Sequence, residues 1–102
     1  MSKLIKLAAV SDITNGKMKE YKVEDKRITI ANINGSFHAF SALCTHAECS
    51  LAGGFLDGKA VTCYCHGAQF DLQTGKVLAP PATKPLVIYK VKIEKEDIFV
   101  EI

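Results

Sequence analysis

The sequence predicts an all-β domain, in which an antiparallel base is built from both ends of the chain and carries an inserted, loop-rich segment. Three observations favour this fold. Apolar and polar residues alternate with a period of two near both ends, Asn34-Gly35 is a strong two-residue hairpin signal, and no stretch has a convincing helical period. With 102 residues, the chain suffices for one domain with a buried core, so we expect a single domain over residues 1–102.

The first strands of the base are predicted from the alternation over residues 20–31. A half-buried strand turns every second side chain toward the core. The pattern therefore assigns Ile28 and Ile30 to the core face, and it assigns Thr29 and Ala31 to the face in water.

The remaining strands are predicted at residues 36–41 and near the C-terminus. Alternation returns on both sides of a turn at Glu94–Glu96, which predicts a C-terminal hairpin over about 89–102. The base is therefore expected to be sandwich-like. Four phenylalanines, distributed over the base and the central loops, are expected to provide core and loop packing: Phe37, Phe40, Phe55 and Phe70.

The central segment has a different composition from the two ends. It holds all four cysteines, two of the three histidines and five of the seven glycines, and Ala79-Pro80-Pro81 follows it. Turn signals are dense there, and we assign Asp57 and Asp71 to turns and not to acid–base chemistry. We expect a loop-rich subdomain over about residues 44–78.

Two short motifs in this segment have the spacing of metal ligands. Cys44-Thr45-His46 and Cys63-Tyr64-Cys65-His66 read as Cys-x-His, sixteen residues, then Cys-x-x-His. Each motif offers one thiolate and one imidazole. A Cys₂His₂ set suits tetrahedral zinc, and it equally suits a [2Fe–2S] cluster with two thiolates on one iron and two imidazoles on the other. The ligand types by themselves leave both metals open.

The motifs and their surroundings resemble the Rieske proteins, especially the small ferredoxins that serve ring-hydroxylating oxygenases. The resemblance covers nearly the whole chain and includes residues 67–71, Thr74-Gly75 and the Pro-Pro segment at 80–81. It implies the Rieske iron–sulfur fold with one [2Fe–2S] cluster per chain. The ligands it implies are Cys44 and Cys63 on the buried iron, and His46 and His66 on the outer iron.

The resemblance also implies roles for Cys49 and Cys65 and a consequence of the alanine at position 68. Cys49 and Cys65 stand where the Rieske proteins of cytochrome bc complexes carry a disulfide between the two cluster loops, so the resemblance implies a disulfide between them here. The alternative is two free thiols, which a reducing cytosol would favour. Ala68 stands where high-potential relatives commonly carry a serine that hydrogen-bonds a cluster sulfide. Because alanine cannot donate that bond, we expect a lower potential.

The resemblance implies a one-electron carrier between a reductase and an acceptor such as an oxygenase, without a substrate of its own. Contact is expected at His46 and His66, with Ala47, Gly67 and Pro81 forming an apolar patch. One alternative is a small electron-entry subunit of a larger oxidoreductase. The other is a zinc-stabilised interaction domain.

The remaining features exclude other classes of function. His38 is interpreted as a strand-face residue, and it is too little for a mononuclear iron site, which needs two histidines and a carboxylate. The net charge is +2, and the lysines are scattered among acids, so no nucleic-acid-binding surface is expected. No stretch approaches the ~20 apolar residues of a membrane span. We expect a soluble cytoplasmic protein, and the sequence does not predict its oligomeric state.

Overall fold

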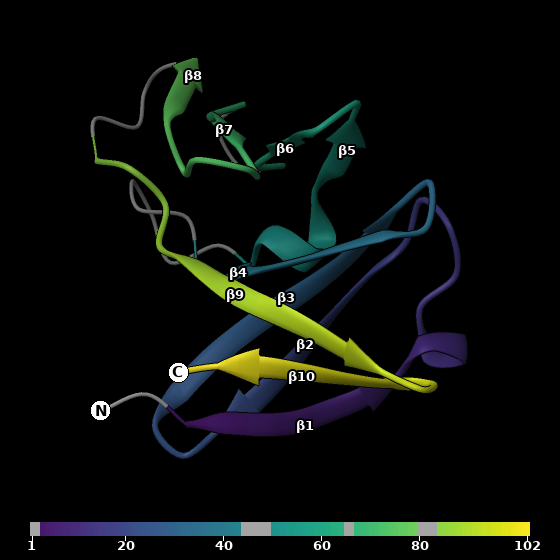
Figure 1. Ribbon diagram of the computed structural model, residues 1–102. Coiled ribbons are helices and arrows are strands. Elements are labelled where there is room, and N and C mark those ends of the chain that lie inside the picture. The colour runs from purple at the N-terminus through teal and green to yellow at the C-terminus, as the bar shows by residue number, and fades with distance from the viewer. Residues whose placement is uncertain (1–2, 44–49, 65–66, 80–83) are drawn as a thin grey trace.

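The all-β prediction is confirmed by a computed structural model, which describes residues 3–43, 50–64, 67–79 and 84–102 (Figure 1). Within these residues, the only helical elements are two three-residue 3-10 turns, η1 and η2. The elements in chain order are β1 (Leu4–Ala9), η1 (Val10–Asp12), β2 (Met18–Val23), β3 (Lys26–Ile33), β4 (Ser36–Ser41), η2 (Leu51–Gly53), β5 (Phe55–Asp57), β6 (Ala60–Thr62), β7 (Gln69–Asp71), β8 (Val77–Ala79), β9 (Ile88–Glu94) and β10 (Asp97–Glu101).

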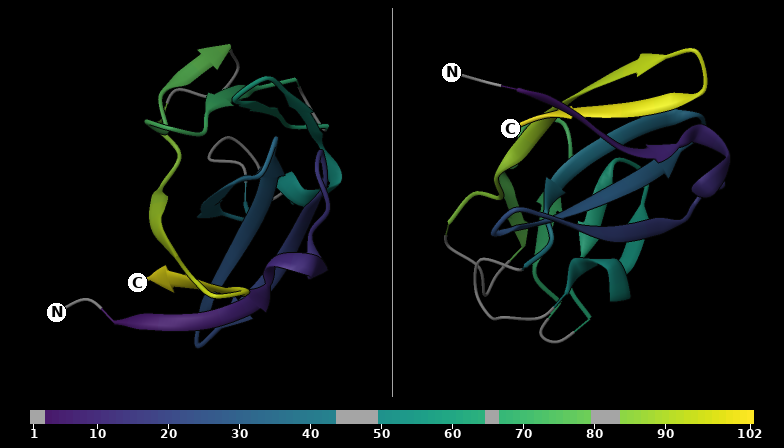
Figure 2. Two further views of the ribbon diagram at one scale, coloured as in Figure 1. Left: turned by 45° about the vertical axis from the view of Figure 1, so that its right-hand side comes forward. Right: turned by 90° about the horizontal axis from the view of Figure 1, so that it is seen from below.

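In the described part of the chain, ten strands form two antiparallel sheets. The larger sheet has the order β1-β10-β9-β4-β3-β2 and joins strands from both ends of the chain. Two backbone hydrogen bonds between Lys3 and Ile102 extend the pairing of β1 with β10 toward the two ends of the chain. The smaller sheet has the order β5-β6-β7-β8 and lies on one side of the larger sheet, above it in the left view of Figure 2.

The two predicted hairpin turns are confirmed. Asn34 and Gly35 both have positive φ, of 53° and 87°, between β3 and β4, as a two-residue turn of this hand requires. At the other end, Lys95 has a φ of 57° between β9 and β10. These turns fix the register, so that Ile28 pairs with Ser41 and Ile98 pairs with Ile93.

The core of the base lies inside the larger sheet, which curls so that β1 and β10 face β2 and β3. Ile28 and Ile30 are fully buried there, as the alternation predicted. Ile98 and Val100 approach them from β10, and Ile13 packs into the same cluster after η1. The sandwich-like base therefore comes from one curled sheet.

The second face of β3 is also buried, which corrects the assignment of Thr29 and Ala31 to water. Both residues are fully buried, because the smaller sheet covers this face of β3 and β4. Paired residues form a row across this face, from one edge strand to β9. The row consists of Glu20, Thr29, Phe40 and Ile88.

A second core fills the space between the two sheets. Phe40 from the base packs here with Phe70, Val61 and Cys63 from the smaller sheet, and Leu51 from η2 joins them. This cluster attaches the segment that carries the cysteine motifs to the base.

The prediction for the phenylalanines is wrong at one position. Phe40 and Phe70 are buried, and Phe37 is packed against the core of the base. Phe55, on edge strand β5, is 65% exposed. Its backbone pairs with Thr62, but its side chain points away from the core between the sheets, where the neighbouring Leu56 packs.

Candidate metal centre

The second motif begins at Cys63, directly after β6, at the end of the β6–β7 hairpin. The backbone N–H of Cys63 donates to the carbonyl of Ala68 over 2.8 Å, and the N–H of Gly67 donates to the carbonyl of Cys63 over 3.0 Å. Gly67 has a φ of 78°, which a glycine adopts without strain. Cys63 is only 1% exposed and takes part in no disulfide. A buried thiol therefore stands at the closed end of a hairpin.

The loop of the first motif has both of its ends fixed to each other and to the base. Leu43 and Ser50 form an isolated antiparallel bridge. The N–H of Leu51 donates to the carbonyl of Ala42 over 2.7 Å, and the N–H of Ala42 donates to the carbonyl of Arg27 on β3 over 2.9 Å. Leu51 is fully buried in the same apolar cluster as Cys63. The two motif loops thus start from one shared core.

A side-chain network connects the end of the first loop to the edge strand β2. Ser50 Oγ donates to Glu20 Oε1 over 2.7 Å, and Arg27 Nε donates to Glu20 Oε2. The hydrogen bond from Arg27 is the main cause that lowers the pKa of Glu20, the bond from Ser50 adds to it, and partial burial opposes both. Glu20 therefore remains an anion that accepts from both neighbours.

Tyr64, inside the second motif, contacts the segment that follows the first motif loop. Its side chain is 55% exposed, and its ring lies over Gly53 of η2: a Cβ atom on Gly53 would be 3.2 Å from Tyr64 Cε1. At Gly54, a Cβ atom would be only 2.1 Å from the carbonyl oxygen of Thr62. The sequence marks Gly53-Gly54 only as a turn; the structure uses these glycines for the close approach of η2 to the β6–β7 hairpin.

Cys63 is the one predicted cluster ligand among the described residues. Cys44, His46 and His66 lie outside them, as do the predicted disulfide partners Cys49 and Cys65 and the predicted contact residues Ala47 and Pro81. Over the described ranges, no three His, Cys, Asp or Glu side chains come together in a further metal-binding group. Apart from Cys63, the structure therefore describes the segments that flank the predicted ligands.

His38 lies on β4, where the sequence analysis expected a strand residue. It shares the face of Phe40 and points toward the smaller sheet. Burial is the main cause that lowers the pKa of His38; the charge of Lys59 lowers it further, and Asp71 opposes both. His38 is thus a partly buried imidazole between the sheets.

The assignment of Asp71 to a turn is confirmed. Its Oδ1 accepts from the backbone N–H groups of Gln73 and Thr74, over 2.7 Å and 3.3 Å. This arrangement is typical of aspartate at the start of a turn. Asp57 is the last residue of β5, directly before the turn to β6.

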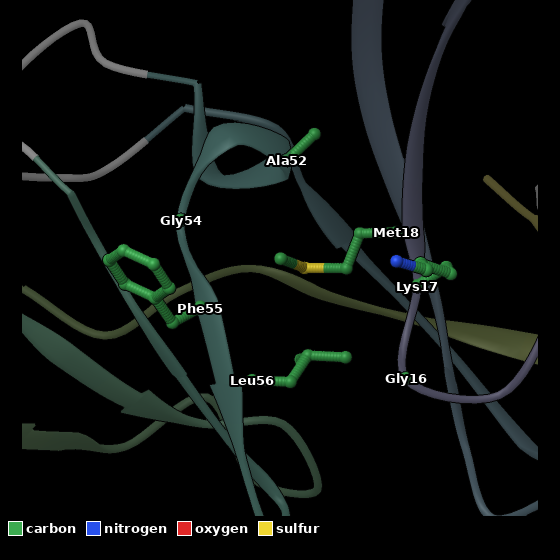
Figure 3. A pocket seen from close by; sticks show the side chains of 7 residues that line it. All are labelled: Gly16, Lys17, Met18, Ala52, Gly54, Phe55 and Leu56. Carbon is green, nitrogen blue, oxygen red and sulfur yellow. The ribbon is translucent and has the colours of Figure 1, made fainter.

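A pocket of about 370 Å³ lies between the start of β2 and the η2–β5 segment, at the free edges of both sheets (Figure 3). Met18 and Leu56 extend into the space between its walls, and Lys17 is its one ionisable lining residue. The pocket brings together no set of catalytic side chains. Its full lining is Gly16, Lys17, Met18, Ala52, Gly54, Phe55 and Leu56.

Comparison with known proteins gives a consistent result. Residues 3–90 match the family model of the Rieske [2Fe-2S] domain. The biphenyl dioxygenase ferredoxin subunit of Pseudomonas sp. strain KKS102 is 37% identical over 97 residues, which cover 94% of this chain and 89% of that protein. Sulredoxin of Sulfurisphaera tokodaii is 48% identical over 75 residues, covering 72% of this chain and 67% of that protein.

Solved structures share the fold as well. A chain from the complex of reduced oxygenase and oxidized ferredoxin in carbazole 1,9a-dioxygenase superposes with a TM-score of 0.88 at 30% identity, covering 94% of this chain and 99% of that chain. Among the described residues, no helix has the length and apolar character needed to cross a membrane.

Proposed function

Because this chain belongs to the Rieske [2Fe-2S] domain family, we propose that it carries single electrons on a cluster held by Cys44 and Cys63 on one iron and by His46 and His66 on the other. The observation that carries the ligand assignment is the buried Cys63 thiol at the closed end of the β6–β7 hairpin. Leu51, which follows the first motif loop, packs into the same apolar cluster.

The donor set and its surroundings fit such a cluster. Two thiolates and two neutral imidazoles leave the oxidised centre neutral and the reduced centre at −1, whereas four thiolates would give −2 and −3. Adding an electron to a neutral centre costs less in a site of low dielectric constant, and Rieske potentials accordingly lie within roughly −150 to +300 mV. The apolar neighbours of Cys63 keep water away from the thiolate side. Ala68, fully buried beside it, offers no hydroxyl, which favours the lower part of this range.

We propose a reductase as the electron donor and an oxygenase as the acceptor. The relatives named above include a ferredoxin subunit of a dioxygenase and a ferredoxin in complex with its oxygenase. Tyr64 lies within the second motif and Gly67 follows it directly; both are exposed and are available to a partner. Redox encounters of this kind use small interfaces, which permits rapid exchange. In this role the chain alone transforms no organic substrate. We also propose a cytoplasmic location, which cell fractionation would test.

We also propose that Cys49 and Cys65 form a disulfide between the two motif loops. The packing of the Tyr64 ring over Gly53 supports this, because it brings the frames of the two loops together. Mass spectrometry after alkylation of the denatured, unreduced protein would test the pair. A disulfide leaves Cys49 and Cys65 unlabelled until a reductant is added; labelling of both without reductant would contradict it.

The test of the proposed function is low-temperature EPR on the dithionite-reduced protein, with iron and zinc counted on the same sample. We expect about two irons per chain and a rhombic S = 1/2 signal with an average g near ~1.9. Loss of this signal in His46→Cys, with iron retained, would support the mixed ligand set. An average g near that of all-cysteine clusters in the native protein, or one zinc per chain and no iron, would contradict it.

A further inference from the structure

We propose that Glu20 and Ser50 act as positioning residues that hold the first motif loop in place for the cluster, so that their hydrogen bond controls how long the cluster is retained. We call this pair, together with Arg27, the β2 latch. The inference rests on the ligand assignment proposed above, because it concerns the loop that carries Cys44 and His46.

The latch joins parts of the chain that lie far apart in sequence. Ser50 follows the first motif loop directly, and Glu20 lies 30 residues earlier on β2, the edge strand of the larger sheet. Glu20 belongs to the row with Thr29 and Phe40, on the face of the sheet that the smaller sheet covers. Its carboxylate is therefore on the side of the sheet where the motif loop returns.

The charge on Glu20 is what gives the bond its strength. Its side chain is only 24% exposed, and one carboxylate oxygen accepts from Arg27 while the other accepts from Ser50. A hydrogen bond to an ionised, partly desolvated acceptor is about twice as strong as one between neutral groups. Without the Ser50 hydroxyl, the carboxylate would lose a partner in a place where water reaches it only partly.

The backbone contacts of the same loop explain why one side-chain bond matters. Among the described residues, the ends of the loop are joined by the bridge between Leu43 and Ser50 and by the hydrogen bond from the N–H of Leu51 to the carbonyl of Ala42. The N–H of Ala42 ties these ends to Arg27 on β3. The latch is the side-chain contact that also ties them to the edge strand β2.

The experiment measures the rate of cluster loss from the oxidised holoprotein, followed as the decay of visible absorbance with excess chelator at neutral pH. For Ser50→Ala and for Glu20→Ala we expect cluster loss that is about five- to tenfold faster, the effect of one charge-assisted hydrogen bond. The double variant should be no faster than the worse single variant, and Ser50→Thr, which keeps the hydroxyl, should restore the native rate.

Two controls separate the latch from ordinary destabilisation. Glu24→Ala removes a similar ion pair, with Lys3 at 3.0 Å. Glu24 is 54% exposed and its partner lies at the start of the chain, so the rate of this variant should stay within about twofold of the native rate. Ile98→Val removes one methylene from the core of the base. It should lower the unfolding midpoint without broadening the EPR signal of the reduced cluster, whereas Ser50→Ala should broaden it, because the ligands are held less uniformly.

Two results would overturn the latch, provided that the wild-type protein shows the mixed-ligand EPR signal. One is an unchanged rate of cluster loss in Ser50→Ala; the other is strictly additive effects of the two substitutions in the double variant. Equal acceleration by Ser50→Ala and by an Ile98 variant of the same unfolding midpoint would overturn it too. A wild-type protein without the mixed-ligand signal would instead refute the proposed function itself.

Discussion

Replacing Gly75 by alanine tests how closely the segment before β9 approaches the smaller sheet. Gly75 has a φ of 80°, its N–H donates to the carbonyl of Asp71, and its carbonyl accepts from the N–H of Leu86 over 2.7 Å. A Cβ atom there would be 2.1 Å from the carbonyl oxygen of Leu86 and 3.1 Å from Ile88 Cγ1. The nearest obstacle is backbone, which cannot rotate away.

The magnitude follows from two separate costs. Left-handed backbone costs an alanine about 1–2 kcal/mol, and the lower entropy of the unfolded variant returns about 0.4–1 kcal/mol of this. The steric overlap adds about 1–3 kcal/mol, as overpacking does elsewhere in well-packed proteins. We expect Gly75→Ala to lower the free energy of unfolding by about 3 kcal/mol in total.

Gly16 provides the matched control, because it isolates the backbone cost. Its φ is 81°, nearly that of Gly75, but a Cβ atom at Gly16 would meet nothing within 4 Å. Gly16→Ala should therefore lose only about 1 kcal/mol, so that the two variants differ by about 2 kcal/mol. At about 4–8 °C per kcal/mol for a domain of this size, their unfolding midpoints should differ by roughly 8–16 °C.

The assay is thermal and urea unfolding of both holoproteins, followed by circular dichroism under identical conditions. Equal losses in the two variants would refute the reasoning, because the positive φ alone would then account for the cost at Gly75. A larger loss in Gly16→Ala would refute it as well.

Three further predictions concern buried polar chemistry. In Ala68→Ser, a hydroxyl that donates to a cluster sulfide should raise the reduction potential by about 60–130 mV. This equals roughly 1.5–3 kcal/mol, at 59 mV per tenfold change for one electron. A redox titration that shows no rise would contradict this prediction. Burial lowers the pKa of His38 below the ordinary 6.5, so the unfolded chain takes up this proton at a higher pH than the folded one. The stability that the neutral imidazole contributes is fully present above pH 6.5 and is lost as the pH falls from there through the lower pKa of the folded protein. His38→Gln should therefore weaken the drop in unfolding midpoint between about pH 8 and about pH 5, and an unchanged drop would count against this assignment. Thr29 is fully buried, and within the described part of the chain its Oγ1 has no hydrogen-bond partner. Thr29→Val should therefore leave the free energy of unfolding unchanged or raise it by about 1 kcal/mol. A decrease of more than about 1 kcal/mol would contradict this prediction.

The sequence by itself determined the local structure of the base and the kind of cofactor. Asn34-Gly35 fixes a tight hairpin because both residues adopt positive φ, and alternation around residues 89–102 predicts the last two strands. The [2Fe–2S] cofactor could be predicted because the two motifs and their surroundings resemble the Rieske proteins. The ligand types alone did not decide it, since two thiolates and two imidazoles also suit zinc.

The tertiary structure alone decided which faces are covered. Alternation placed Thr29 and Ala31 in water, and both are buried, because period two reports the side of a strand but not whether a second sheet covers that side. The same limit explains Phe55, which the sequence assigned to packing and which is exposed on an edge strand.

The frame of the candidate site also depends on the tertiary structure. Glu20 and Ser50 are 30 residues apart, and nothing in either local sequence indicates their hydrogen bond. Gly53 reads as a turn residue, yet it lies beneath the ring of Tyr64. The first contact forms when the segment after the first motif loop reaches the edge strand β2, and the second forms beside the paired strands β5 and β6. Both depend on which distant segments the fold brings together, and local patterns carry no information about that.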